Sequence, residues 1–193
     1  MKFQLPTVLI FLLAALASAQ AASIVVNSTA DPTGFDPNIT VATLGSTVTL
    51  RDAVNAANNT GGTNTVAFNA SLAGGIIALG IDGDDTFGPS ALLVSSALTI
   101  DGGAGGITIT RDTTAQPTRL RLFYVNGAGN LTLKNLTVSG GKALGGSGNN
   151  GGGAAGLGGA IVNAGLLQLV QTTVTGNQAI GGSQNNNAGA KSP

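Results

Sequence analysis

Hydrophobic and polar residues alternate in short runs over most of this chain. From residue 63 onwards the runs alternate apolar side chains with Thr, Ser or Asn, and Gly or Asn residues separate one run from the next. An alternation with a period of two is typical of β-strands that bury one face. No helical pattern separates these runs, which argues against strand–helix–strand crossovers. Strands are predicted within residues 24–26, 64–70, 74–80, 90–103, 105–112, 120–127, 130–141, 158–165 and 166–177.

One segment near the N-terminus has a helical pattern instead, over about residues 49–58. Its apolar residues have the spacing i, i+3, i+4 and i+7 of a single helical face: Leu50, Ala53, Val54 and Ala57. Thr49 is the expected N-cap residue, and Asp52 occupies the acidic position of a capping box. The two glycines at 61–62 end the helix. Because so short a helix is marginally stable alone, we expect it to pack against an apolar surface.

The second half of the chain repeats itself with a period of about 36 residues. This shift places Leu131, Leu133, Val138, Gly140 and Ala143 on Leu167, Leu169, Val174, Gly176 and Ala179. The agreement continues through the Gly- and Asn-rich loops that follow. One unit cannot bury its own apolar face, so stacked units must supply the core. We therefore predict coils of short strands in which the apolar residues point inward and stack, whereas Thr132 and Thr137 face solvent.

The first residues have the pattern of a cleaved secretory signal peptide, which we assign to residues 1–21. Lys2 precedes an apolar run at 5–17, which is shorter than the roughly 20 residues that a membrane span needs. Small residues then allow cleavage after Ala19 or Ala21, and the alternative is an uncleaved anchor. We expect no transmembrane segment in the mature chain.

The remaining chain divides into three parts: an N-terminal cap at 22–62, coils at 63–182 and a polar tail at 183–193. The period places the next Gly-Gly-Ala-Ile strand at about residue 194, so the tail has the position of a further repeat. We expect a fragment of a longer repeat protein, with any anchor beyond residue 193. The alternative is a short protein whose tail forms a polar cap.

Composition limits the classes of function. Charged residues make up 8% of the chain, and the formal net charge is +0. A chain of this charge lacks the basic face that binding to nucleic acid requires. There is no Cys, no His and no Glu. Disulfides, thiolate or histidine metal sites and a His-dependent serine triad are therefore excluded. Gly, Asn, Thr and Ser supply an uncharged polar surface, which indicates an extracellular, β-rich protein.

Two sets of motifs resemble known families. The sequence TLRDAVNAAN at 49–58 resembles the T/S-L-R-E-A-I-x-x-A-N element of bacterial secreted CSLREA-domain proteins. Val48 stands where that family has Cys, Asp52 replaces Glu, and Val54 replaces Ile. The segment at 96–112 is similar to the family's first full coil. GGAI at 158–161 and TVTGN at 173–177 are similar to the paired GGAI and F-x-x-N motifs of polymorphic outer-membrane-protein-like repeats, without the Phe.

The resemblance covers roughly residues 23–182. It implies a right-handed parallel β-helix on or outside the cell surface, with the helix capping the first coil, and it implies no catalytic residues. The fold class that we predict is accordingly all-β, a right-handed parallel β-helix with a short N-terminal capping α-helix. We assign structural roles to Leu50, Arg51, Asp52, Val54, Asn58, Leu131, Leu133, Val138, Leu167, Leu169 and Val174.

Three features could carry chemistry. Residues 151–156 spell G-x-G-x-x-G, but a strand-like segment follows and no acidic residue occurs after Asp112, so nucleotide binding is not predicted. Asp82, Asp84 and Asp85 form the one acidic cluster, which is a weak calcium candidate or a solvated turn. Arg51 has no adjacent catalytic partner, so we expect it to pair with Asp52 or another carboxylate, or to bind carbonyls at the open end of the first coil.

The sequence therefore predicts a secreted or cell-surface structural or adhesin-like protein without cofactors or enzymatic activity. Its Thr-, Asn- and Gly-rich faces would bind an extracellular glycan or protein surface. The alternative is a carbohydrate-active β-helix, similar to polysaccharide lyases or glycosidases, or a non-catalytic carbohydrate-binding remnant. That alternative requires a converging group drawn from Asp82, Asp84, Asp85, Asp101, Asp112, Arg111, Arg119 and Arg121. Otherwise, Arg119 and Arg121 are expected to be exposed residues on one face of a strand.

Expression of the full chain in a secreting host tests the assignment of the signal peptide. We expect the exported protein to begin at Gln20 or Ala22, because a signal peptidase cleaves after small residues that follow an apolar core. N-terminal sequencing and the intact mass of the exported protein measure this. An exported or membrane-bound product that retains Met1 would contradict the prediction.

Overall fold

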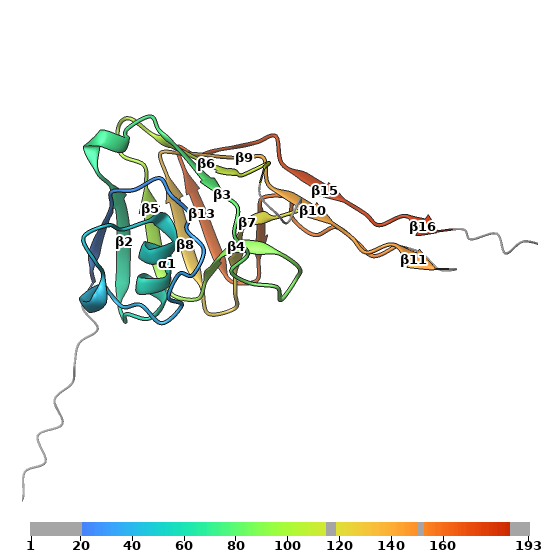
Figure 1. The fold of residues 1–193 in the computed structure, drawn as a ribbon, viewed down its shortest axis with the longest axis horizontal. Helices are drawn as coiled ribbons and strands as arrows, with labels where there is room; N and C mark the ends of the chain where they lie inside the picture. Colours follow the sequence, from blue (N-terminus) through green and yellow to red (C-terminus); the bar gives the residue numbers. More distant parts are fainter. Residues whose placement is uncertain (1–20, 115–118, 150–152, 186–193) are drawn as a thin grey trace, which may run out of the picture.

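The chain winds into successive coils, and strands of neighbouring coils pair side by side in parallel (Figure 1). A computed structural model describes residues 21–114, 119–149 and 153–185. Three sheets run along the axis of the coils, and each complete coil contributes one strand to each sheet. The architecture is a right-handed parallel β-helix with one short α-helix near its N-terminal end, which confirms the fold class predicted from the sequence.

The sheets are named here in the order in which the chain enters them. Sheet A consists of β1 (Ser23–Val26), β2 (Thr63–Phe68), β5 (Ala97–Asp101), β8 (Asn130–Lys134) and β13 (Leu166–Val170). Sheet B consists of β3 (Ile76–Leu79), β6 (Ile107–Arg111), β9 (Leu136–Ser139) and β14 (Thr173–Thr175). Sheet C consists of β4 (Ser90–Val94), β7 (Arg121–Val125) and β12 (Ile161–Asn163).

Two short ladders extend away from these sheets on one side of the coils (Figure 1). In them β10 (Lys142–Leu144) pairs with β15 (Gln178–Ile180), and β11 (Gly148–Asn149) pairs with β16 (Gln184–Asn185). The alternation of apolar residues did not predict these strands, because each is only two or three residues long and too short to show a period of two. The runs at 90–103, 130–141 and 166–177 each form two strands of different sheets rather than one.

The pairing register confirms the repeat seen in the sequence. Leu131 lies opposite Leu167 and Leu133 opposite Leu169 across β8 and β13. On sheet B, Val138 lies opposite Val174. The corners repeat as well. Gly140 and Gly176 both have positive φ, at 71° and 63°, and Asn135 and Gln171 both lie in the left-handed region, at 54° and 48°. Glycine adopts this conformation without strain, and asparagine tolerates it better than most residues.

Burial of the inward-facing residues depends on how many neighbouring coils cover them. Leu131, Leu133 and Val138 are completely buried, because strands of other coils lie on both sides of β8 and β9. Their repeat partners on β13 and β14 have a described strand on one side only. Leu169 and Val174 are accordingly 46% and 44% exposed. The stacking that the repeat predicted is present, but the burial is incomplete in this last described coil.

The helix α1 (Leu50–Asn58) begins where the capping signals predicted. The Thr49 side chain accepts a hydrogen bond from the Asp52 backbone N–H, and the Thr49 backbone N–H donates to the Asp52 carboxylate at 3.1 Å. The apolar stripe packs against the first strands, and its residues are fully buried: Leu50, Ala53, Val54 and Ala57. Two 3-10 turns, η1 (Val41–Thr43) and η2 (Ala70–Leu72), complete the helical elements. No helix in the described ranges is long and apolar enough to span a membrane.

Side chains of α1 take the place of a missing strand beside β4. Strand β4 is the edge of sheet C, so alternate backbone groups on one side have no strand to bond. Arg51 Nη1 donates to the carbonyl of Ala91 at 2.5 Å, and Asn58 Nδ2 donates to the carbonyl of Leu93 at 2.8 Å. The next group, the N–H of Ser95, donates to Asn58 Oδ1 at 2.9 Å. The helix therefore caps the coil by satisfying the strand edge as well as by covering the core.

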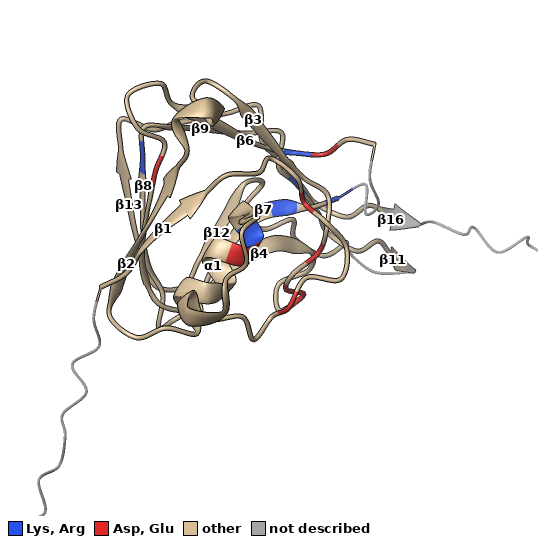
Figure 2. Ribbon diagram, turned by 60° about the vertical axis from the view of Figure 1, so that its left-hand side comes forward, with Lys and Arg blue, Asp and Glu red and all other residues tan. Residues whose placement is uncertain are grey.

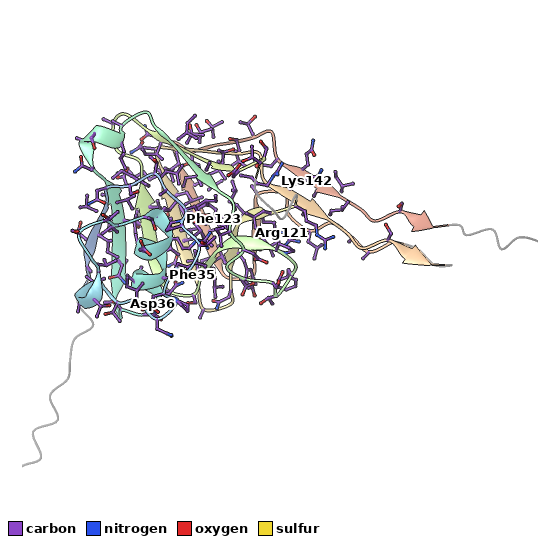
Figure 3. The ribbon with its side chains drawn as sticks, in the orientation of Figure 1. Phe35, Asp36, Arg121, Phe123 and Lys142 are labelled. Atoms are coloured by element: carbon purple, nitrogen blue, oxygen red, sulfur yellow. The ribbon has the colours of Figure 1, made fainter. Side chains whose placement is uncertain are left out.

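Arg51 is also held by a buried ion pair. Its Nε and Nη2 donate to the two carboxylate oxygens of Asp31, at 2.7 and 3.0 Å, and its side chain is 1% exposed. Asp31 Oδ2 accepts two more hydrogen bonds, from the backbone N–H groups of Gly80 and Ile81. Phe35, labelled in Figure 3, lies with its ring centroid 4.7 Å from the guanidinium. Of the partners that the sequence left open for Arg51, the structure shows a carboxylate other than Asp52, namely Asp31, together with the carbonyls of Ala91 and Ile81. Asp52 caps the helix instead.

Three predicted features fall wholly or partly outside the described residues. These are residues 1–20 of the signal peptide, the first two glycines of the G-x-G-x-x-G at 151–152, and residues 186–193 of the tail.

The substitution Arg51→Met tests the cap. We expect it to lower the free energy of unfolding by about 3–5 kcal/mol, because it leaves the buried Asp31 carboxylate without a counter-charge and the Ala91 and Ile81 carbonyls without a donor. Urea denaturation of the exported chain measures the change. The matched control is Lys134→Met, which removes a cation from an exposed pair with Asp101 and should cost about 1 kcal/mol or less. Equal losses for both variants would contradict the proposed role of Arg51.

Candidate functional site

The acidic cluster forms a tight turn between β3 and β4. Asp82 Oδ1 accepts hydrogen bonds from the N–H groups of Asp84 and Ser90, each at 3.2 Å. Asp84 Oδ1 accepts from the N–H of Thr86 at 2.9 Å, and Asp84 Oδ2 accepts from the Thr86 hydroxyl. These are local turn contacts of the kind that Asp side chains make. Among the described residues, no group of three or more acidic side chains is arranged to hold a metal ion. Asp82, Asp84 and Asp85 are therefore not arranged as such a group in the described structure.

The turn does perturb one carboxyl group. Burial raises the pKa of Asp82 above its ordinary value of 3.8, and the negative charge of Asp85 raises it further. The backbone N–H groups of Asp84 and Ser90 oppose this shift by stabilising the ionised form. A carboxyl group whose pKa is raised stabilises the folded chain less when it is ionised than when it is protonated.

The other acidic candidates lie elsewhere on the coils, as the separated red segments in Figure 2 show. Asp101, on β5, forms an ion pair with Lys134 at 2.9 Å and accepts a hydrogen bond from Asn135 Nδ2 at 2.8 Å. Burial raises the pKa of Asp101, but hydrogen bonds from Gly103, Lys134 and Asn135 lower it by more, so that it lies below 3.8. Asp112 accepts hydrogen bonds from the backbone and hydroxyl of Thr114. Asp101 and Asp112 are therefore not brought together with Asp82, whose neighbouring carboxylate is that of Asp85 in the same turn.

Two of the arginine candidates, Arg119 and Arg121, instead form part of a basic pocket of about 280 Å³. Arg111 lies outside this pocket, and its Nε donates to the carbonyl of Gly140 at 3.0 Å. The sequence reading of Arg121 as an exposed strand residue is wrong, because its side chain is nearly buried, at 5% exposure. Arg119 precedes β7 and is exposed. None of the candidate carboxylates lines this pocket. Its walls are formed by Phe87, Gly88, Pro89, Arg119, Arg121, Lys142, Ala143, Leu144, Gly145, Gly146, Ala154 and Ala155.

A second pocket, of about 370 Å³, lies at the corner between sheets A and B. Gly74 and the segment 103–106, which contains three glycines and Ala104, form one side, and Asn135 and Gln171 lie at the corner. The other side is a column of threonines from three successive coils, Thr108, Thr137 and Thr173, which lie opposite one another in the sheet register. We call these three residues the threonine column. The lining residues of this pocket carry no charge, and among the described contacts the three hydroxyls form no side-chain hydrogen bond.

Sequence reasoning found some of these residues and missed others. It placed Thr137 on the solvent face. The 36-residue period also aligns Thr173 with Thr137, so the repeat could have predicted this part of the threonine column. It missed Asp31, the partner of Arg51. It also missed the buried Asn64, whose Oδ1 accepts from the Ala22 N–H and whose Nδ2 donates to the carbonyls of Ala57 and Thr60. Nothing local marks Asp31 or Asn64, because their partners lie in other elements.

Comparisons with known proteins found no relative of this chain. No family model, no curated protein and no solved structure matches this chain. The fold defines the class as a parallel β-helix protein, and the described residues line an uncharged pocket and a basic pocket. Membership of the CSLREA-domain family, which the resemblance of residues 49–58 suggests, stays a prediction.

The substitution Asp82→Asn tests the acidic turn. We expect the introduced amide to keep an acceptor oxygen and to remove the cost of the ionised carboxylate, so the variant should be at least as stable as the parent at pH 7. Relative to this variant, the parent should lose stability as the pH rises from 3.8 through the raised pKa of Asp82, because folded Asp82 retains its proton to a higher pH than unfolded Asp82. The difference between the two proteins should vanish below pH 3.8. Denaturation curves over this pH range measure it.

The variant Asp85→Asn serves as a matched control, because it removes the neighbouring charge and leaves Asp82 in place. We expect Asp85→Asn to be more stable than the parent at pH 7, by part of the gain expected for Asp82→Asn. A parent protein that becomes more stable relative to Asp82→Asn as the pH rises would contradict the sign of the effect.

Proposed function

We propose that this chain is a secreted or cell-surface β-helix of adhesin type, which binds an uncharged extracellular glycan passively through the threonine column and performs no catalysis. The signal-like residues at 1–21 support export. The uncharged polar surface suits a protein that stays outside the cell.

The observation that carries the proposal is the regularity of the threonine column. Strands in a sheet lie about 4.8 Å apart, so Thr108, Thr137 and Thr173 present hydroxyls at that interval along the axis of the coils. Each hydroxyl can both donate and accept a hydrogen bond. A glycan presents hydroxyls of the same kind along an extended chain. The fixed strand backbone holds the side chains in place before binding, which reduces the entropy lost on association.

A catalytic role has less support. Polysaccharide lyases and glycosidases of the type considered need acidic and basic groups that converge on one bond. The basic pocket has no carboxylate in its lining, and the threonine pocket has no charged residue in its lining. The acids at Asp82, Asp101 and Asp112 are each engaged in their own local contacts.

Replacing the column tests the proposal. The triple variant Thr108→Val, Thr137→Val and Thr173→Val keeps β-branched side chains of similar shape but removes the three hydroxyls. We expect retention of the protein on immobilised uncharged polysaccharides such as cellulose, xylan and mannan to fall roughly tenfold or more, since each lost hydrogen bond contributes about 0.5–1.5 kcal/mol. Binding isotherms with the soluble oligosaccharide that is retained best give the change in Kd.

A second column on sheet A provides the matched control. Thr65, Thr99 and Thr132 also lie in register across successive coils, but they do not line the pocket. Their replacement by Val should leave binding unchanged. Equal losses for both triple variants, or no binding of the parent chain to any uncharged glycan, would overturn the proposed site.

A further inference from the structure

The basic pocket is built by side chains from three successive turns of the coil. Phe87, Gly88 and Pro89 come from the loop before β4, and Arg119 and Arg121 come from the segment that enters β7. Lys142 and Leu144 belong to β10, and the Gly-rich segments after it complete the wall. Figure 3 labels Arg121 and Lys142 near the place where β10 leaves the coiled body. The fold thus gathers three cations from two successive coils at one corner.

Arg121 is a buried cation without a carboxylate partner among the described residues. Its Nε donates to the carbonyl of Leu157 at 2.6 Å, and its Nη1 donates to the carbonyl of Gly88 at 2.7 Å. Both acceptors are neutral, so they fix the guanidinium in place but do not cancel its charge. The ion pairs in the described part of the chain involve Arg51 and Lys134, not Arg121. Burial lowers the pKa of Arg121, although an arginine remains protonated in proteins.

A buried charge is costly unless an opposite charge or a ligand compensates it. A guanidinium has five N–H donors, and the two bonds to carbonyls leave others free for a ligand. Arg119 and Lys142 add two more cations to the same pocket. Beyond Asp112 the sequence contains five basic residues and no acidic residue, so this half of the chain has no carboxylate of its own to offer.

The remaining walls are suited to a small ring. Phe87 is 43% exposed, and its ring is held edge-on against Tyr124 with centroids 5.3 Å apart. An aromatic face of this kind can cover the apolar face of a sugar. The rest of the wall consists of residues with small side chains or none, which leave room for the ring: Ala143, Ala154 and the two glycines at 145–146. A volume of about 280 Å³ is at the small end of ligand pockets and accommodates one ring rather than an extended chain.

We propose that the basic pocket binds an acidic sugar residue, whose anionic group lies against Arg121, Arg119 and Lys142 and whose ring covers Phe87. Arginine matches carboxylate and sulfate groups through two parallel hydrogen bonds, which selects such an anion over a neutral sugar. The choice of a sugar as the carrier rests on the proposed extracellular function, whereas the anion site does not. The site is separate from the threonine column, so each can fail without the other.

Binding of two matched probes tests the inference. The first probe is an oligogalacturonide, which carries carboxylates, and the second is its methyl ester, which has the same sugar backbone without the charge. We expect the acid to bind the full exported chain at least tenfold more tightly than the ester, with an affinity that falls as salt is added. A sulfated oligosaccharide such as a heparin fragment, measured in parallel, identifies which anion the site prefers. Isothermal titration calorimetry measures all three.

Variants then locate the site. Lys142→Gln and Arg119→Gln remove cations at the rim without disturbing buried bonds, and together they should weaken binding of the acid roughly tenfold or more. Arg121→Gln should abolish binding, but the rim variants keep the test valid if that protein fails to fold. Lys134→Gln is the control, since Lys134 is paired with Asp101 away from the pocket, and it should have no effect. The valine variant of the threonine column should also bind the acid normally.

Either of two results would overturn the anion site, and a third would overturn the acidic sugar as its ligand. One is equal affinity for the acid and its ester, which would show that the cations do not select the ligand. The other is unchanged binding of the acid by the double rim variant. Displacement of the oligosaccharide by inorganic sulfate at equal concentration would retain an anion site but reject the acidic sugar as its ligand.

Discussion

The whole structure depends on satisfying and covering the edges of its parallel strands. A strand at the end of a stack has a row of unpaired backbone groups and an uncovered apolar interior. At the N-terminal end, Arg51 and Asn58 donate to the β4 edge while the apolar face of α1 covers the core. Asp31 holds Arg51 in place and also binds the backbone of Gly80 and Ile81. A few polar side chains thus form the hydrogen bonds that an additional strand would form. They include the buried Arg51–Asp31 ion pair, and removing one partner of such a pair is strongly destabilising.

Away from this cap, each coil is stabilised by its neighbours. Leu131 is buried because β5 lies on one side of β8 and β13 on the other. Leu169 occupies the equivalent inward position one coil later and remains half exposed, since only one described strand adjoins β13. Identical residues in identical positions therefore contribute differently to stability. This is the expected behaviour of a solenoid, in which the interfaces between repeats contribute much of the stability.

The same stacking creates both candidate binding sites. Side chains on the outside of the coils recur at the strand spacing, so three threonines become a column. Arg119 and Arg121 from one coil and Lys142 from the next form the basic wall of a pocket. The uncharged column and the basic pocket are suited to different ligands. Each pocket is lined by residues from successive coils, so stacking of the coils brings its walls together.

The sequence alone determined the parallel coil, the capping box at Thr49 and Asp52, and the register of Leu131 on Leu167. Each of these follows from local periodicity or from a fixed repeat, which residue spacing expresses directly. It did not determine that Arg51 would bind Asp31, that Arg121 would be buried, or that Lys142 would join it. Those outcomes depend on which loops of separate coils meet at a corner. Such contacts join residues far apart in the chain through loops without periodicity, so the tertiary structure alone decided them.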